Sequence, residues 1–208
     1  MISLVTKTVA NITNNAMTTF SASAQWYAWI DFDGPSMNLQ VRISTSPAKP
    51  AAAQIQATVN IYAILGQTTM VVGFSGATGG YFQTNSVYAW EFLVAGIRSI
   101  FFCPLPYFCS DHLVFDIGQR VINYGFLNSF MTLIGNATMP GYLILTTSAA
   151  SEGGAAYCNT AFTYYRNGAT LNFGASFTFI IDQPHSPAGD GMTFVVSVSL
   201  KRCFLSLK

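Results

Sequence analysis

Asp190 is the side chain of this sequence with the clearest capacity for chemistry. It ends a loop containing Pro and Gly inside Phe177–Val196, which reads FTFIIDQPHSPAGDGMTFVV. Apolar runs typical of β-strands flank the loop, so two buried strands should hold it. A single ionised carboxylate on a stiff loop accepts strong hydrogen bonds from a ligand, but it lacks the second titratable group that acid–base catalysis uses. The stretch therefore predicts a binding site rather than a catalytic one.

The remaining titratable side chains form no catalytic pattern. Glu152, Asp182 and Asp190 are scattered along the chain, and Ser186 beside His185 has no third member of a triad in view. We therefore expect no enzymatic activity.

Two further patterns could hold a metal ion or a nucleotide, and neither is complete. Cys103, Cys109 and His112 lie close in sequence, but their spacing matches no common zinc site. The glycine-rich segment Gly73–Gly80 (GFSGATGG), which we expect to be a loop, lacks the Lys and Ser/Thr of a phosphate-binding loop, and no helical pattern follows it. Neither zinc nor a nucleotide is expected.

The composition excludes nucleic acid as a partner. The chain has 208 residues and a net charge of +1, with 51% of its residues hydrophobic and 8% charged. This length allows one domain with a real core, and the basic stripe that nucleic acid binding requires is missing. So few charges favour a poorly soluble piece, or a surface that is glycosylated or covered, either in a homo-oligomer or by a partner chain at exposed sheet edges.

Features of secretion are mixed. The four cysteines permit disulfides whose pairing cannot be read from the sequence, and small buried side chains are the other interpretation. The glycosylation sequons at Asn11 and Asn136 matter only if the chain is secreted. Met1–Ala10 is too weakly apolar for a signal peptide. Arg98 and two prolines interrupt the apolar run Phe92–Cys109, which favours buried strands with a turn over a membrane span.

Alternating apolar residues and turn signals predict β-structure throughout. A hairpin is expected around Asp33-Gly34, with Leu39, Val41 and Ile43 facing the core. No stretch has a helical period, and many short strands separated by turns favour an all-β sandwich. The predicted strands are Gln25–Asp31, Met37–Ser44, Ala57–Tyr62, Met70–Phe74, Val87–Leu93, Leu113–Ile117, Met131–Ile134, Tyr142–Thr146, Ala161–Tyr165, Leu171–Ile181 and Met192–Leu200.

Three blocks of residues resemble the legume-type (L-type) lectin family, and above all the lectin ectodomains of plant receptor-like kinases. The blocks are Trp29–Val41 (WIDFDGPSMNLQV), Val72–Phe92 (VGFSGATGGYFQTNSVYAWEF) and the stretch from Asn128 to Val196. The resemblance implies a legume-lectin (concanavalin A-like) jelly-roll β-sandwich, complete or lacking a strand. It also implies a non-catalytic function in carbohydrate recognition, outside the cell or at the plasma membrane.

The blocks stand in an unusual order, because the third block comes first in most of the family. Here residues 1–92 resemble the C-terminal half of the family domain, 93–127 form a junction, and 128–208 resemble the N-terminal half. A sandwich whose termini lie close together tolerates such a circular permutation. The other interpretation joins the end of one lectin unit to the start of the next, and the apolar tract after Arg98 lies where that second unit would begin.

The resemblance also implies a sugar site. Asp190 matches the family's sugar-binding aspartate, which accepts hydrogen bonds from two sugar hydroxyls, and Gly191 follows it. Gly79, Gly80 and Tyr81 match the variable loop that sets sugar preference, where an aromatic ring can stack on the apolar face of a sugar. A simple turn at Asp190-Gly191 and a surface tyrosine are the structural alternatives.

The metal ligands of the family are not found. The family binds calcium and manganese through an E-x-D strand followed by an asparagine, an aspartate and a histidine, so no cofactor is expected from this chain. Asp31-Phe32-Asp33 mimics that motif but belongs to the first block, and its alternation puts both carboxylates on one exposed face. Sugar binding should then be weakened. The alternative function is a degenerate sandwich that binds no sugar and serves as a protein-interaction or structural module.

Overall fold

The computed structural model describes residues 3–4, 12–13, 23–94, 99–100, 119–124, 130–182 and 190–198. Their elements are β1 (Ser3–Leu4), β2 (Ile12–Thr13), β3 (Gln25–Asp33), β4 (Asn38–Ser44), β5 (Ile55–Thr58), α1 (Ile61–Leu65), β6 (Thr69–Ala77), β7 (Thr84–Val94), β8 (Ser99–Ile100), β9 (Gln119–Tyr124), β10 (Met131–Gly135), β11 (Leu143–Thr146), β12 (Gly153–Cys158), β13 (Phe162–Thr163), β14 (Tyr165–Arg166), β15 (Ala169–Thr170), β16 (Phe173–Asp182) and β17 (Gly191–Ser197). The predicted all-β class is confirmed.

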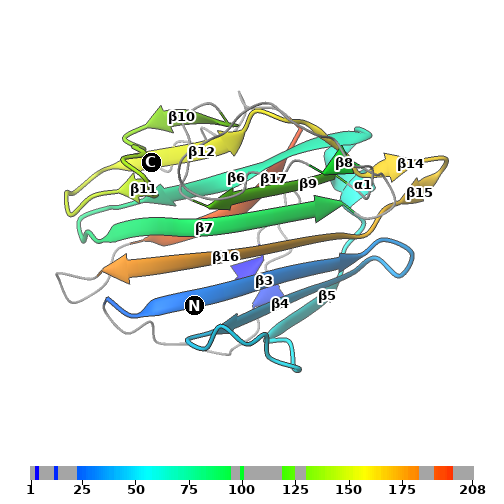
Figure 1. Ribbon diagram of the computed structural model, residues 1–208, viewed down its shortest axis with the longest axis horizontal. Coiled ribbons are helices and arrows are strands. Elements are labelled where there is room, and N and C mark those ends of the chain that lie inside the picture. The colour runs from blue at the N-terminus through cyan, green and yellow to red at the C-terminus, as the bar shows by residue number, and fades with distance from the viewer. Residues whose placement is uncertain are drawn as a thin grey trace.

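Two main sheets contain most of these strands (Figure 1). The larger sheet has the order β5-β4-β3-β16-β7-β9-β8, with β11 also paired to β7. In the smaller sheet β6 pairs with β12 on one side and with β17 and β13 on the other, and β10 extends the sheet beyond β12. The described strand pairs are antiparallel except for β8 with β9, so alternate side chains of each strand face the space between the sheets.

The two sequence halves are interleaved rather than adjacent. Strand β16 lies between β3 and β7, and it pairs with β3 over eight residues and with β7 over ten. In the smaller sheet, β12 and β17 likewise both pair with β6. Each sheet is therefore completed only when strands from both halves come together.

Aromatic side chains fill the space between the sheets. Phe74 of β6 is fully buried, and its ring contacts Trp90 of β7, Phe177 of β16 and Phe194 of β17 at centroid distances of 5.1 to 5.7 Å. The contacts are edge-on, the arrangement that the quadrupoles of aromatic rings favour. Phe74 thus joins both sheets at one point.

The hairpin predicted at Asp33-Gly34 is present between β3 and β4. The amide of Met37 donates to the Gly34 carbonyl at 3.2 Å and closes the turn. A Cβ on Gly34 would lie 2.0 Å from the carbonyl oxygen of Thr170, so no larger residue fits there. Leu39 is buried and Ile43 packs against the core, as the alternation predicted, and Val41 between them is half-buried.

The strand predicted over Ala57–Tyr62 is wrong in its second half. Strand β5 ends at Thr58, and the helix α1 begins at Ile61. The Asn60 side chain caps that helix by accepting from the Ala63 amide at 2.9 Å, and Gly66 ends it in the left-handed conformation. These capping residues override the β-propensity of Ile61 and Tyr62.

The loop predicted over Gly73–Gly80 is also corrected, because β6 continues to Ala77. Strands β12 and β17 pair with both edges of this segment and hold it extended. A Cβ on Gly73 would lie 2.1 Å from the carbonyl oxygen of Ala156. The glycine therefore serves close strand approach, and the loop begins only at Thr78. The predicted strand Leu113–Ile117, and with it His112, His185, Cys103, Cys109 and Cys203, lies outside the described residues.

Candidate binding site at one end of the sandwich

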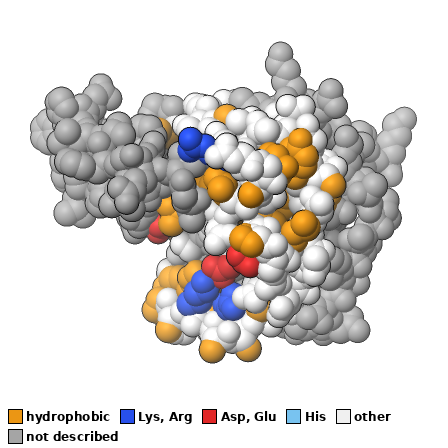
Figure 2. Space-filling model, turned by 90° about the vertical axis from the view of Figure 1, so that its right-hand side faces the viewer, with side chains coloured by type: hydrophobic (Ala, Val, Ile, Leu, Met, Phe, Trp, Pro, Cys, Tyr) orange, Lys and Arg blue, Asp and Glu red, His pale blue; other side chains and the backbone are white. Residues whose placement is uncertain are grey.

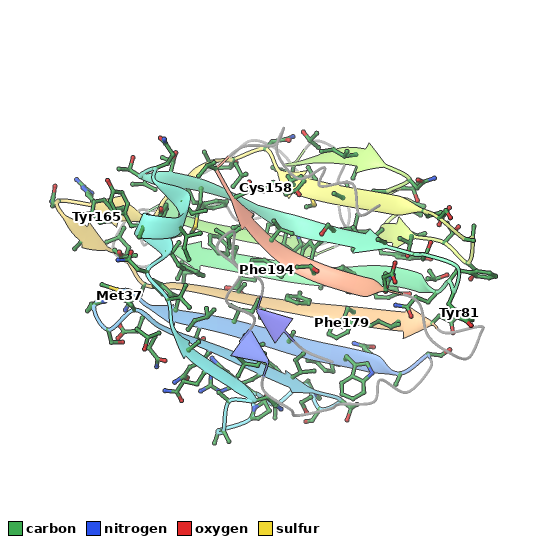
Figure 3. The ribbon with its side chains drawn as sticks, turned by 180° about the vertical axis from the view of Figure 1, so that it is seen from behind. Met37, Tyr81, Cys158, Tyr165, Phe179 and Phe194 are labelled. Atoms are coloured by element: carbon green, nitrogen blue, oxygen red, sulfur yellow. The ribbon has the colours of Figure 1, made fainter. Side chains whose placement is uncertain are left out.

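The strand register brings the predicted site residues to one end of the sandwich. Gly191, at the start of β17, and Gly153, at the start of β12, both pair with Ala77 at the end of β6. Residues directly after β6 and directly before β17 must therefore be neighbours. In Figure 3, Tyr81 lies at this end, and Met37 and Tyr165 lie at the other.

Asp190 and Gly79 are brought together, although 111 positions separate them in sequence. A Cβ built on Gly79 would lie 3.4 Å from Oδ2 and 3.7 Å from Oδ1 of Asp190. Asp190 is exposed, and within the described part of the chain no group donates a hydrogen bond to its carboxylate. The absence of a side chain at position 79 leaves both carboxylate oxygens open to a ligand.

The other predicted residues surround this pair. Gly80 is exposed, and no atom lies within 4 Å of where its Cβ would stand, so a ligand can approach its backbone. Tyr81 is 55% exposed, which leaves its ring available for stacking. Gly191 has a φ of +95°, a conformation that favours glycine. The turn alternative and the ligand-binding interpretation of Asp190-Gly191 are compatible with this geometry.

Hydrogen bonds to the segment between β11 and β12 hold the loop that contains Gly79. Buried Thr78 donates through Oγ1 to the Ala149 carbonyl at 2.8 Å and accepts there from the Glu152 amide at 2.9 Å. The Ser151 amide donates to the Gly79 carbonyl at 3.1 Å. The Glu152 carboxylate in turn accepts from the Thr147 hydroxyl at 2.9 Å. The loop therefore has a support made of the protein's own groups.

A buried polar network lies beneath the site, and sequence reasoning missed it. Asn85 accepts from Gln83 Nε2 at 3.0 Å and donates to Thr146 Oγ1 at 2.7 Å. Thr146 then donates to the Gln83 carbonyl at 3.0 Å, and all three residues are almost fully buried. Gln83 Nε2 lies 3.9 Å from where a Cβ of Gly191 would stand, directly below the loop. Polar Asn85, two positions before apolar Val87 at the start of a buried strand, was the available signal.

The described residues do not fit a calcium or manganese centre. No three His, Cys, Asp or Glu side chains gather anywhere in the described part of the chain. Asp31, the first acid of the metal-like motif, instead pairs with Arg42 and Lys49 at 2.7 Å each, and Asp33 accepts from the Ser36 hydroxyl. Figure 2 shows such acidic and basic side chains lying next to one another. The motif is thus a surface ion-pair group.

The one cysteine among the described residues is not a reactive nucleophile. Cys158 of β12 is a free thiol with 2% of its surface exposed, as the interpretation of the cysteines as buried apolar side chains predicted. Burial raises the pKa of this thiol, which disfavours the thiolate.

No helix in the described ranges has the length and apolar character needed to cross a bilayer.

Two comparisons with known proteins agree with the fold. Residues 1–100 match the legume lectin domain family, and this range includes the first two sequence blocks. The L-type lectin-domain containing receptor kinase SIT2 of Oryza sativa subsp. japonica is 38% identical over 71 residues. Those residues make up 33% of this chain but only 10% of the rice protein, so the chain corresponds to a small part of that relative. The first hundred residues therefore resemble an L-type lectin domain, and the antiparallel sheets of the chain agree with the β-sandwich of legume lectins.

Proposed function

We propose that the chain binds carbohydrate without catalysis, through Asp190 and the loop Gly79, Gly80 and Tyr81. The observation that carries the proposal is the open carboxylate of Asp190 facing the side-chain-free position 79. An ionised carboxylate accepts two hydroxyl protons at once, and the hydroxyls of a sugar are spaced for that contact. The exposed ring of Tyr81 supplies an apolar surface for the other face of the sugar.

The affinity of this site is expected to be weak. The loop is supported by hydrogen bonds from the segment Thr147–Glu152, and the described residues offer no group of metal ligands beneath it. A shallow site with one carboxylate and one ring makes few contacts, so millimolar binding of a monosaccharide is the expected range, about 4 kcal/mol of binding free energy.

Isothermal titration with a panel of neutral monosaccharides tests the proposal. Asp190→Asn removes the charge at nearly constant shape, and a hydrogen bond to a charged group contributes ~1.5–3 kcal/mol. The variant is therefore expected to bind about 10- to 100-fold more weakly. Equal affinity is expected with calcium and with a chelator, because no three metal-binding side chains gather among the described residues.

Asp33→Asn is the matched control. It removes an exposed carboxylate at the end of β3 that lies away from the Asp190 site. It is expected to bind like the unaltered protein. If Asp190→Asn also binds like the unaltered protein, the site is misplaced. If the folded protein binds no sugar of the panel, the interaction or structural module is the better description.

We further propose an extracellular or plasma-membrane-associated setting, which the description of the rice relative as a receptor kinase supports. The sequon at Asn136 gives a test, because Asn136 is exposed between β10 and β11. When the protein is directed through a secretory pathway, Asn136 is expected to carry an N-glycan. Glycosidase treatment should then increase gel mobility, and Asn136→Gln should abolish the part of that shift due to this site. If the untreated Asn136→Gln variant had the same gel mobility as the untreated, unaltered protein, glycosylation at Asn136 would be contradicted.

A further inference from the structure

The outer face of the larger sheet, which points away from the core, carries two shallow hollows lined by aromatic rings. Trp26 and Ala28 of β3 are buried in the core, so Tyr27 and Trp29 between and after them face outward. On the neighbouring strand β16, Ser176 pairs with Trp29 and Thr178 with Tyr27, which places these hydroxyls beside the rings. None of these residues belongs to the loop site around Asp190.

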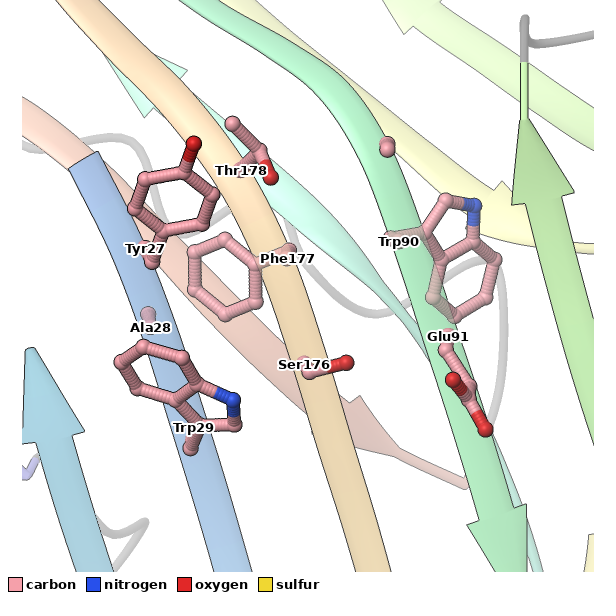
Figure 4. A pocket seen from close by; sticks show the side chains of 9 residues that line it. Tyr27, Ala28, Trp29, Trp90, Glu91, Ser176, Phe177 and Thr178 are labelled. Atoms are coloured by element: carbon pink, nitrogen blue, oxygen red, sulfur yellow. The ribbon is translucent and has the colours of Figure 1, made fainter. Parts of the chain in front are cut away.

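The first hollow is centred on the pair Tyr27 and Trp29. Their rings are nearly parallel, with an angle of 19° and a centroid distance of 6.2 Å. The hollow has a volume of about 160 Å³, and Ser176, Thr178 and Glu91 form its polar side (Figure 4). It therefore offers two ring faces next to two hydroxyls and a carboxylate.

The second hollow exists because of a β-bulge. The pairing of β16 with β7 shifts between Thr178 and Phe179, so that Tyr88 is the extra residue. A bulge of this kind re-aims a side chain, and Tyr88 points outward and stacks on Tyr142 of the segment before β11, at 4.7 Å and 15°. The volume is about 300 Å³, and Asp182, Ser86, Thr84, Ser23 and Ile180 complete the lining.

The two hollows follow each other along β16. Thr178 lines the first and Ile180 the second. From Ser176 to Asp182 the strand extends for about 20 Å, enough for several sugar rings in a row. We propose that this face, from Trp29 to Tyr142, is a second binding surface that takes a neutral oligosaccharide chain lying along β16.

The chemistry of the lining favours this ligand. A sugar ring has an apolar face that stacks on aromatic rings and an edge of hydroxyls that bind carboxylates and hydroxyls. The described residues that line the two hollows include Glu91 and Asp182 but no Lys or Arg, so this lining favours a neutral ligand over an acidic polysaccharide. Arg42, which pairs with Trp29 in the register, is already bound to Asp31 at 2.7 Å.

A second copy of the chain fits this face less well. The centres of protein interfaces are depleted of serine and of acidic residues. Here Ser23, Ser86 and Ser176 line the hollows together with both carboxylates.

Burial raises the pKa of Tyr88, so its phenol stays a neutral hydrogen-bond donor over the physiological range.

Affinity electrophoresis in gels containing a soluble neutral polysaccharide, such as xyloglucan, hydroxyethylcellulose or galactomannan, tests the proposal. The unaltered protein is expected to be retarded by at least one of them, and not by polygalacturonate. Trp29→Ala and Tyr88→Ala should each weaken the retardation about tenfold through loss of a stacking ring. Tyr62→Ala is the matched control, because Tyr62 is 37% exposed like Tyr88 and stacks on Tyr165 at 3.8 Å, at the other end of the molecule.

Asp190→Asn separates this surface from the loop site. It should lose monosaccharide binding but keep the retardation, since Asp190 lines neither hollow. Retardation abolished by Asp190→Asn and unaffected by Trp29→Ala and Tyr88→Ala would overturn the second surface and leave the loop site standing. A dimer in sedimentation that Trp29→Ala dissociates would overturn it as well, in favour of a second copy. If Trp29→Ala does not fold, Trp29→Phe is used instead, because it keeps the packing. The readout is then tryptophan fluorescence: the change that polysaccharide induces in the unaltered protein should be lost in Trp29→Phe.

Discussion

Replacing Phe74 by alanine is expected to lower the free energy of unfolding by about 3–5 kcal/mol, the range for a fully buried phenylalanine. The side chain has no exposed surface, and its ring touches rings on β7, β16 and β17. Truncation would leave a cavity where the two sheets meet, and neighbours held on three different strands cannot collapse fully into it.

Urea denaturation followed by circular dichroism measures this loss. Phe130→Ala is the control, because Phe130 is 41% exposed and its truncation should cost well under 1 kcal/mol. A loss below ~1 kcal/mol for Phe74→Ala would mean that the sheets do not pack around this ring. At temperatures where Phe74→Ala is partly unfolded, ligand affinity at the Asp190 site is also expected to fall, since β17 follows Asp190 directly.

Replacing Asn85 by leucine is expected to have the second large effect on stability, and it is also expected to affect the binding site. The change removes the acceptor used by Gln83 Nε2 and the donor used by Thr146 Oγ1, both inside the protein. Leaving buried polar groups without these partners costs ~1–3 kcal/mol for each such group. Because Gln83 lies below Gly191, we also expect the carboxylate of Asp190 to shift and sugar affinity to fall.

A double-mutant cycle with Thr146→Val measures the coupling. In the double variant both partners of the 2.7 Å bond are gone, so its loss of stability should be smaller than the sum of the single losses. Full additivity would show that the two side chains do not interact. Unchanged sugar affinity in Asn85→Leu would separate the network from the site.

The class of fold and most strands could be predicted from the sequence alone. Alternation in β16 and the turn at Asp33-Gly34 depend on neighbours in the chain, and such local patterns are readable. The helix at Ile61–Leu65 was missed because it is a single short turn whose cap residues outweigh its β-formers. The length of β6 was missed because glycine has two uses, in turns and in close strand contacts.

Only the tertiary structure decided which residues meet. Gly79 and Asp190 come together because β17 and β12 both align with the end of β6, and that register depends on core contacts between distant segments. For the same reason the partner of Asn85 across the strands and the bulge that turns Tyr88 outward were not predictable. Asp190 could be singled out from its residue type and its place in a loop. That its carboxylate faces Gly79 and is accessible to a ligand could be seen only in the folded chain.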